Sequence, residues 1–266
     1  MKKILQYLFE HKTLSREKAK EVLVQISQGQ YNEHEVTSFV TVYLMRSITI
    51  EELMGFRDAL LSLAVKVDVG VDNAIDIVGT GGDGKDTFNI STLACFIVAG
   101  AGQSVVKHGN YGASSVSGAS NVMEQLGYTF KNDQAELAKE VKEAGICFLH
   151  APLFHPALKI VSPIRRNIGV RTFFNMLGPL VNPSSPQNLM LGTFNLEIAR
   201  LYHYILQEEK SKTVTTLTVA RIVDLPKKKV VRAFVEELDE PVVLWEGAAY
   251  DAAGQWTDSD VEARLT

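Results

Sequence analysis

The sequence of 266 residues has few cysteines, little excess charge and no long apolar run. Its two cysteines, Cys95 and Cys147, both lie in apolar stretches, so we expect buried free thiols rather than a disulfide or a metal pair. A net charge of −4 argues against a broad nucleic-acid-binding surface. No stretch approaches the roughly 18 apolar residues that a membrane span needs. The N-terminal MKKILQYLFEHK is followed by no small-residue cleavage site, and the sequence therefore predicts a cytoplasmic protein.

Residues 1–66 are predicted to form helices only, because their apolar residues recur at helical spacing. Three polar residues at predicted helix starts are typical N-caps, two of them with a glutamate three positions later: Ser15, Asn32 with Glu35, and Thr49 with Glu52. This pattern predicts a small helical domain over residues 1–66, and we expect part of residues 155–185 to join it.

Strands and helices alternate from residue 74 onward. The predicted strands cover 74–78, 104–108 and 146–151, and the predicted helices cover 91–101, 122–126 and 133–144. Alternation at this spacing is typical of a mainly parallel sheet with helices on its faces. We therefore expect an α/β domain over residues 74–266.

The first motif with chemical content is GTGGDGKDTFNIS, which begins at Gly79 directly after a predicted strand. Its glycines permit positive φ and let backbone N–H groups approach an anion. The helix that starts near Ser91 points its positive end to the same place, which favours a pyrophosphate. Asp83 suggests a bridging cation or a ribose hydroxyl. A tight glycine turn without a ligand is the alternative, and the spacing matches neither a Walker A loop nor a dinucleotide fingerprint.

The second motif, KHGNYGASSVSG, covers residues 107–118 and also lies between a predicted strand and a predicted helix. Lys107 supplies a point charge, and the serines at 114, 115 and 117 supply hydrogen-bond donors for phosphate oxygens. Taken alone, His108 is more typical of a structural residue and Asn110 of a turn. Two such loops after neighbouring strands favour phosphate binding.

The third motif, IRRNIGVRTFFNMLGPLVNP, covers residues 164–183. Arginines on a helix usually form a solvated face. Here Arg165 precedes Gly178 and Asn182 in one motif, which favours a carboxylate-binding arginine.

In combination and in order, these motifs resemble the anthranilate phosphoribosyltransferase family, from the N-terminus to about Arg200. The resemblance implies a homodimer whose substrates bind between a small helical domain and an α/β domain. It implies that phosphoribosyl pyrophosphate is bound by Gly79, Gly82, Asp83, Thr87, Asn89, Ser91, Thr92, Lys107 and Ser115. It implies that anthranilate is bound by Gly79, His108, Asn110, Arg165 and Gly178, with His155 as a weaker candidate. The implied cofactor is Mg²⁺, with Ser91 as one ligand.

The implied reaction is attack of the anthranilate amine on the anomeric carbon of the ribose, which expels pyrophosphate. Such a carbon passes through an oxocarbenium-like transition state. Catalysis would then come from positioning and from neutralising the leaving group by Mg²⁺, Lys107 and backbone dipoles. No covalent nucleophile is needed.

The sequence departs from the family in two places. Tyr111 stands where many members have arginine, and the resemblance ends at about residue 210. We would expect a Gly-x-Asp-Glu segment there to bind a second magnesium ion. Asp239 and Glu240 form a weak candidate pair, for which a solvated acidic turn is the alternative. We therefore expect a divergent, truncated or altered C-terminal part, and a sheet that lacks its last elements.

Two other functions remain open from the sequence alone. A pyrimidine nucleoside phosphorylase shares this general architecture, although the GTGGD loop and the asparagine of KHGN favour the transferase. A non-catalytic paralogue that binds nucleic acid is compatible with the lysine run at 227–229, whereas the net charge of −4 makes nucleic acid an unlikely partner.

Overall fold

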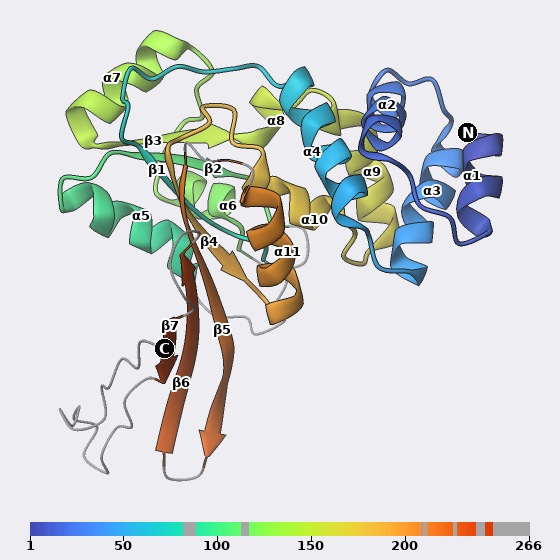
Figure 1. The fold of residues 1–266 in the computed structure, drawn as a ribbon. Coiled ribbons are helices and arrows are strands. Elements are labelled where there is room, and N and C mark those ends of the chain that lie inside the picture. The colour runs from blue at the N-terminus through green and yellow to red at the C-terminus, as the bar shows by residue number, and fades with distance from the viewer. Residues whose placement is uncertain are drawn as a thin grey trace.

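The computed structural model of the chain describes residues 1–81, 89–112, 117–207, 209, 212–225, 228–237 and 243–246, with side chains as far as Val214. Within these ranges, four N-terminal helices are followed by alternating strands and helices (Figure 1). No described helix is long and apolar enough to cross a membrane.

The N-terminal helices begin at the predicted caps. They are α1 (Lys2–Phe9), α2 (Arg16–Ser27), α3 (Glu33–Met45) and α4 (Ile50–Leu63). Ser15 caps α2, and complete capping boxes start α3 at Asn32 and α4 at Thr49. In each box the N-cap side chain and the glutamate three residues later satisfy each other's backbone N–H groups, so the predicted helix starts are confirmed.

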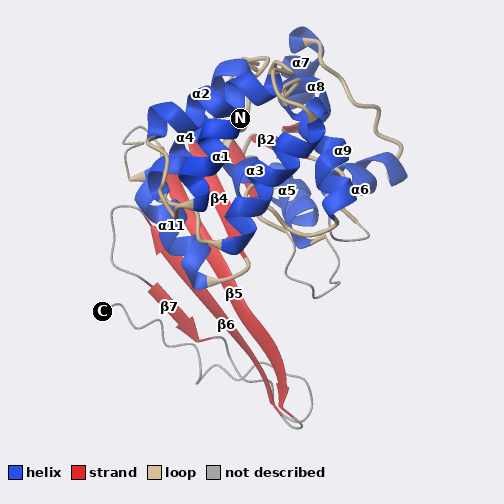
Figure 2. Cartoon of the chain, turned by 90° about the vertical axis from the view of Figure 1, so that its right-hand side faces the viewer, coloured by secondary structure: helices blue, strands red, loops and turns tan. Residues whose placement is uncertain are grey.

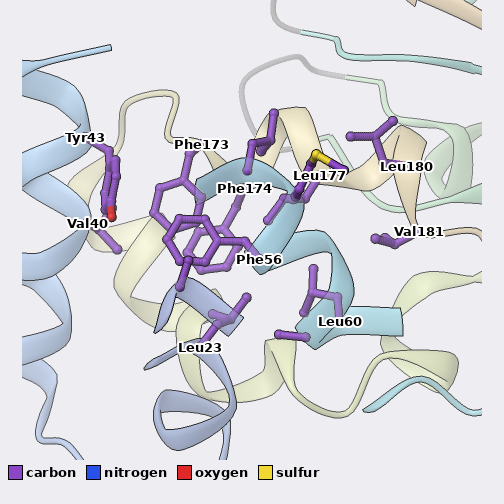
Figure 3. Packing of buried hydrophobic residues seen from close by; sticks show 14 of the residues in the cluster. Leu23, Val40, Tyr43, Phe56, Leu60, Phe173, Phe174, Leu177, Leu180 and Val181 are labelled. Atoms are coloured by element: carbon purple, nitrogen blue, oxygen red, sulfur yellow. The ribbon is translucent and has the colours of Figure 1, made fainter. Parts of the chain in front are cut away.

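A helical module forms around one apolar core that also takes in α9 (Leu158–Ile168), α10 (Phe174–Leu177) and the 3-10 turn η1 (Gly178–Leu180). Figure 3 shows Phe56 of α4 beside Phe173, which immediately precedes α10. Their rings stack with centroids 4.6 Å apart, and Phe39 meets Phe173 edge-on at 6.4 Å. Residues more than 100 positions apart in the sequence thus share this core.

One seven-stranded sheet forms the second layer, in the order β3-β2-β1-β4-β5-β6-β7. Its strands are β1 (Ile75–Gly79), β2 (Val105–Gly109), β3 (Ile146–His150), β4 (Asn188–Thr193), β5 (Thr213–Leu225), β6 (Lys228–Glu237) and β7 (Val243–Glu246). All pairs from β3 to β5 are parallel, whereas β5, β6 and β7 pair antiparallel. The predicted fold class, a helical domain with a mainly parallel α/β sheet, is confirmed.

Helices cover both faces of the sheet around β1 and β2. In one apolar cluster Cys95 of α5 (Ile90–Gly100) packs on Ile77 and Val105, and in another Leu137 of α7 (Gln134–Ala144) packs on Val106. Figure 1 shows α5 and α7 on opposite sides of these strands. The remaining helices are α6 (Ala119–Gln125), α8 (Ala151–Phe154) and α11 (Leu196–Leu206). Because both cysteines are buried and free, the prediction of two thiols without a disulfide is confirmed.

Beyond residue 210 the chain continues the sheet with three strands, and Figure 2 shows β5 and β6 running on past the helices. The expected loss of the last sheet elements stays a prediction, since side chains after Val214 are not described. Asp239, Glu240 and residue 227 of the lysine run lie outside the described residues.

Candidate active site

The strand order reverses at β1, which pairs with β2 on one side and with β4 on the other. In open α/β sheets such a switch point, at the carboxyl ends of the strands, is where ligands bind. At these ends lie Gly79 of β1, Gly109 of β2 and Gly192 of β4. Gly79 is in register with Gly192, and Thr80 donates its N–H to the Gly192 carbonyl at 2.9 Å. Paired glycines leave the backbone open to a ligand at this edge.

The first glycine-rich turn leaves the sheet here. Gly81 has a φ of 64°, a left-handed conformation that favours glycine. The Ser91 hydroxyl lies 3.7 Å from the position that a Cβ atom on Gly79 would occupy, so the serine faces the start of the turn. Three other predicted ligands of phosphoribosyl pyrophosphate, Gly82, Asp83 and Thr87, lie outside the described residues.

Asn89 connects the two glycine-rich loops. Its Oδ1 accepts the N–H of Thr92 at 3.0 Å and so caps α5, while its Nδ2 donates to the Ser117 carbonyl at 3.4 Å. The Thr92 hydroxyl is buried and has no hydrogen-bond partner among the described residues. Among the described residues, the positive end of α5 therefore carries a buried hydroxyl without a hydrogen-bond partner.

Lys107 is buried, with 2% of its surface exposed. Its Nζ donates to the Ile77 carbonyl at 2.7 Å, two residues before the glycine turn begins. The predicted cation thus lies within the sheet, on the same face as α5, and its charge acts on the turn through a low-dielectric interior.

The second glycine-rich loop is closed by contacts that the sequence did not reveal. Asn121 of α6 accepts the N–H groups of Gly112 and Gly118 through its Oδ1, each at 3.0 Å. A Cβ atom on Gly118 would lie 2.1 Å from the Gly112 nitrogen, so only glycine fits there. Asn110 is exposed and its carbonyl accepts the N–H of Ser120 at 3.1 Å. Ser115 lies outside the described residues.

Two buried histidines lie beside Gly178. His108 Nδ1 is 3.3 Å from the Gly178 carbonyl, and the His155 ring lies with its centroid 5.1 Å from that of His108. Burial lowers the pKa of His108 to about 3 and that of His155 to about 4, so both are neutral at pH 7. His108 Nε2 and His155 Nδ1 have no hydrogen-bond partner among the described residues. A Cβ atom on Gly178 would meet nothing within 4 Å, so the space beside it is open.

Arg165 lies on α9 in the helical module and is half-buried. Its guanidinium lies over the Phe174 ring, and Nη2 reaches Asn175 Oδ1 at 3.4 Å. It forms no ion pair with any described carboxylate, and burial lowers its pKa. A half-buried guanidinium with only a long neutral contact is suited to a carboxylate from a ligand. No described contact joins Arg165 to His108.

One more buried polar group belongs to this region, and the sequence motifs did not include it. Asp76 of β1 is fully buried and accepts hydrogen bonds from the His108 backbone and the Asn182 side chain. A lone aspartate in an apolar strand, DIV, was the only sequence signal for it. Its partners lie 32 and 106 positions away, so spacing alone does not predict them.

Within the described part of the chain, no three His, Cys, Asp or Glu side chains gather as a metal site does. Mg²⁺ commonly takes only one or two protein ligands when substrate phosphates supply the others. The Ser91 hydroxyl beside Gly79 is an oxygen donor in the right place for that mode. The described residues therefore fit a metal ion that is bound mainly through the pyrophosphate of a substrate better than a metal ion bound by protein side chains alone.

Two family models match the chain. One, the glycosyl transferase family a/b domain, matches residues 71–226, and the other, the helical bundle domain of the same family, matches residues 2–64. Together they cover the N-terminal helices and the sheet as far as β5, whereas β6 and β7 lie beyond the matched residues.

Curated relatives match over most of this chain. The anthranilate phosphoribosyltransferase of Flavobacterium johnsoniae is 62% identical over 207 residues, which are 78% of this chain and 63% of the relative. That of Christiangramia forsetii is 58% identical over 215 residues, 80% of this chain and 65% of the relative. The chain thus spans less than two thirds of the length of these relatives.

Solved structures agree with the family models. The crystal structure of anthranilate phosphoribosyltransferase from Thermus thermophilus is 30% identical, with a TM-score of 0.78 over 91% of this chain and 72% of that one. The Saccharomyces cerevisiae enzyme in complex with PRPP and Mg is 28% identical, with a TM-score of 0.78 over 91% and 71%. These relatives favour the transferase prediction over the phosphorylase and nucleic-acid-binding alternatives.

Proposed function

Since the chain belongs to the anthranilate phosphoribosyltransferase family of glycosyl transferases, we propose that it transfers the phosphoribosyl group of phosphoribosyl pyrophosphate to anthranilate in tryptophan biosynthesis. The amine nitrogen forms a bond to the anomeric carbon, the bond from that carbon to the pyrophosphate oxygen breaks, and the amine loses a proton. The products are phosphoribosyl-anthranilate and pyrophosphate.

The link between the two glycine-rich loops carries this proposal. Asn89 caps α5 with one side-chain atom and holds Ser117 of the second loop with the other. The two loops are both suited to phosphate and are joined at a helix N-terminus. Together they can bind the two ends of one extended anion such as phosphoribosyl pyrophosphate. A single inorganic phosphate would occupy only one of them.

The residues proposed to bind anthranilate, which accepts the phosphoribosyl group, are Gly79, His108, Asn110, Gly178 and, on α9 of the helical module, Arg165. The guanidinium pairs with the anthranilate carboxylate, and the neutral histidine rings offer nitrogens and flat surfaces to the aromatic ring. With its pKa lowered to about 3 by burial, His108 is a poor proton acceptor at pH 7. We therefore assign the histidines to positioning and propose that catalysis rests on charge stabilisation at the leaving group.

Magnesium is proposed as the cofactor. When bound on the pyrophosphate it neutralises the charge that develops on the leaving group. Ser91 would hold it from the start of α5, and Asp239 and Glu240 remain weak candidates for a second metal site. The residues proposed to bind the phosphoribosyl pyrophosphate itself are Gly79, Gly82, Asp83, Thr87, Asn89, Ser91, Thr92, Lys107 and Ser115.

We also propose a homodimer in the cytoplasm. The outer end of the helical module exposes apolar side chains on α1 and at the end of α3, with Phe9 61% and Met45 83% exposed. Large apolar side chains exposed on a protein surface are candidates for an interface. Sedimentation velocity is expected to give a dimer for the wild type and a monomer for Met45→Glu, and a monomeric wild type would contradict the assignment.

Loss of anthranilate fluorescence tests the proposed reaction. We expect loss only when phosphoribosyl pyrophosphate and Mg²⁺ are both present, and EDTA is expected to stop it. A folded protein that leaves the fluorescence unchanged under these conditions would contradict the proposal. Release of free base from a pyrimidine nucleoside and phosphate would instead support the phosphorylase alternative.

A further inference from the structure

Asp76 contacts two segments of the part of the candidate site that is proposed to bind anthranilate. Its Oδ1 accepts the backbone N–H of His108 at 3.2 Å, and its Oδ2 accepts from Asn182 Nδ2 at 2.8 Å. His108 lies at the end of β2, whereas Asn182 closes the segment that begins at Gly178. One buried carboxylate thus contacts both the end of β2 and the segment from Gly178 to Asn182.

The segment from Gly178 to Asn182 is held by side chains from three directions. His108 contacts the Gly178 carbonyl, Arg57 Nε donates to the Leu180 carbonyl at 3.2 Å, and His155 Nε2 lies 2.8 Å from the Val181 carbonyl. Asn182 ties the segment to β1 and β2, since its Nδ2 also donates to the Val106 carbonyl at 2.9 Å. Asp76 is the acceptor that orients this amide.

A carboxylate at this position costs stability. Asp76 is completely buried and forms no ion pair with any described residue. Burial raises its pKa to about 6, although the nearby charge of Lys107 and the two hydrogen bonds oppose that rise. A buried charge without a contacting cation is poorly explained by stability, because an apolar residue would suit the strand better.

We infer that Asp76 is a positioning residue for the aromatic acceptor, because it sets the spacing between His108 and the segment from Gly178 to Asn182. The inference rests on the proposed function. On the phosphate side, the hydrogen bonds that hold Thr80 to Gly192 and the start of α5 to Asn89 do not involve this carboxylate. Asp76 therefore governs the acceptor more than the phosphoribosyl donor.

Asp76→Asn removes this arrangement with almost no change in volume. Either orientation of the new amide places an N–H donor against the donor of His108 or of Asn182. Asn182 cannot turn to compensate, because its Oδ1 accepts the Ser184 N–H at 2.9 Å and its Nδ2 is held by Val106. In this variant, either the end of β2 at His108 or the segment from Gly178 to Asn182 must therefore shift.

The matched control is Glu52→Gln, which changes another carboxylate with 0% of its surface exposed, but in the helical module. We expect Asp76→Asn to raise the KM for anthranilate about tenfold, to weaken anthranilate binding in fluorescence titrations to the same degree, and to leave the KM for phosphoribosyl pyrophosphate within about twofold. Glu52→Gln is expected to lower Tm and to leave both KM values within about twofold.

Unchanged KM values for Asp76→Asn, or equal increases for both substrates, would overturn the inference. If that variant does not fold by circular dichroism, Asn182→Ser removes the same bond from the other side and must raise the anthranilate KM selectively. A wild-type chain without turnover would count against the proposed function instead, so the two failures are distinguishable.

Discussion

Two fully buried carboxylates, Glu52 in the helical module and Asp76 in the sheet, have opposite surroundings. Glu52 accepts hydrogen bonds from the two terminal guanidinium nitrogens of Arg46, at 2.6 and 2.9 Å, and from the backbone N–H groups of Leu14 and Thr49. Asp76 receives two hydrogen bonds from neutral groups and no ion pair among the described residues. The buried charge of the helical module therefore contributes to stability, whereas the buried charge of the sheet positions the segments around it.

The pKa values express the same difference. Burial raises the pKa of Glu52, but the hydrogen bonds from Arg46, Leu14 and Thr49 outweigh it and leave the value below the ordinary 4.5. For Asp76 the effect of burial exceeds that of the hydrogen bonds and of the charge on Lys107, and its pKa rises to about 6. Charged Glu52 therefore stabilises the folded chain at neutral pH, whereas charged Asp76 destabilises it.

Removing Glu52 should have the largest effect on stability. Glu52→Ala leaves Arg46 and two backbone N–H groups without their acceptor in the module core. We expect the free energy of unfolding, measured by urea denaturation, to fall by about 3 kcal/mol or more. A loss below about 1 kcal/mol would contradict a stabilising role for the Glu52 network and its difference from Asp76.

The helical module and the candidate site each contain a glycine in close contact with neighbouring backbone. A Cβ atom on Gly55 would lie 2.2 Å from the Arg16 carbonyl oxygen, where α4 crosses α2, and one on Gly118 would lie 2.1 Å from the Gly112 nitrogen. Gly55→Ala is expected to cost roughly 1–3 kcal/mol of stability with unchanged KM values. Gly118→Ala is expected to raise the KM for phosphoribosyl pyrophosphate several-fold. Matching effects of the two variants on KM would contradict the division of roles.

The pH dependence of stability should come from the sheet side first. His108 and His155 have lowered pKa values, so below about pH 6.5 the unfolded chain binds protons that the folded chain does not. Asp76 opposes this below about pH 6, because there the folded chain holds one extra proton. For these three groups the net difference is one proton between about pH 6 and pH 4, so they lower the free energy of unfolding by about 1.4 kcal/mol for each unit that the pH falls. His150, whose pKa is also lowered by burial, adds to this fall.

Urea denaturation at pH 7, 6 and 5 measures this slope. His155→Gln retains a donor for the Val181 carbonyl but cannot titrate, and it is expected to flatten the slope. Glu52 contributes only below about pH 4.5, where its stabilisation is lost as the pH falls through its lowered pKa. A wild-type stability that does not change between pH 7 and pH 5 would contradict the assignment of neutral, buried histidines.

Helix caps should give the smallest effects. Thr49→Ala removes one capping box and is expected to cost about 1 kcal/mol of stability without changing KM. Asn89→Ala removes the α5 cap as well as the contact with Ser117, so it is expected to cost a similar free energy and also to raise the KM for phosphoribosyl pyrophosphate. Equal kinetics for the two variants would remove Asn89 from the proposed site.

The same contrast explains how much could be predicted from the sequence. The caps at Asn32 and Thr49 act over three residues, so short patterns revealed the helix starts, and the glycine-rich loops were visible after their strands. The bond between Asp76 and Asn182 spans 106 positions and exists only once the sheet has formed. The burial of Lys107 and the antiparallel pairing of β6 could not be predicted from the sequence for the same reason, because both depend on contacts beyond short sequence patterns.

Anthranilate binding to the wild type and to Arg165→Gln, followed by anthranilate fluorescence, tests the central assignment most directly, because binding requires no turnover. We expect the wild type to prefer anthranilate over its methyl ester, which lacks the carboxylate. Arg165→Gln is expected to lose at least about tenfold in affinity for anthranilate and to bind acid and ester alike. Unchanged affinity and preference in Arg165→Gln would contradict the proposed acceptor site.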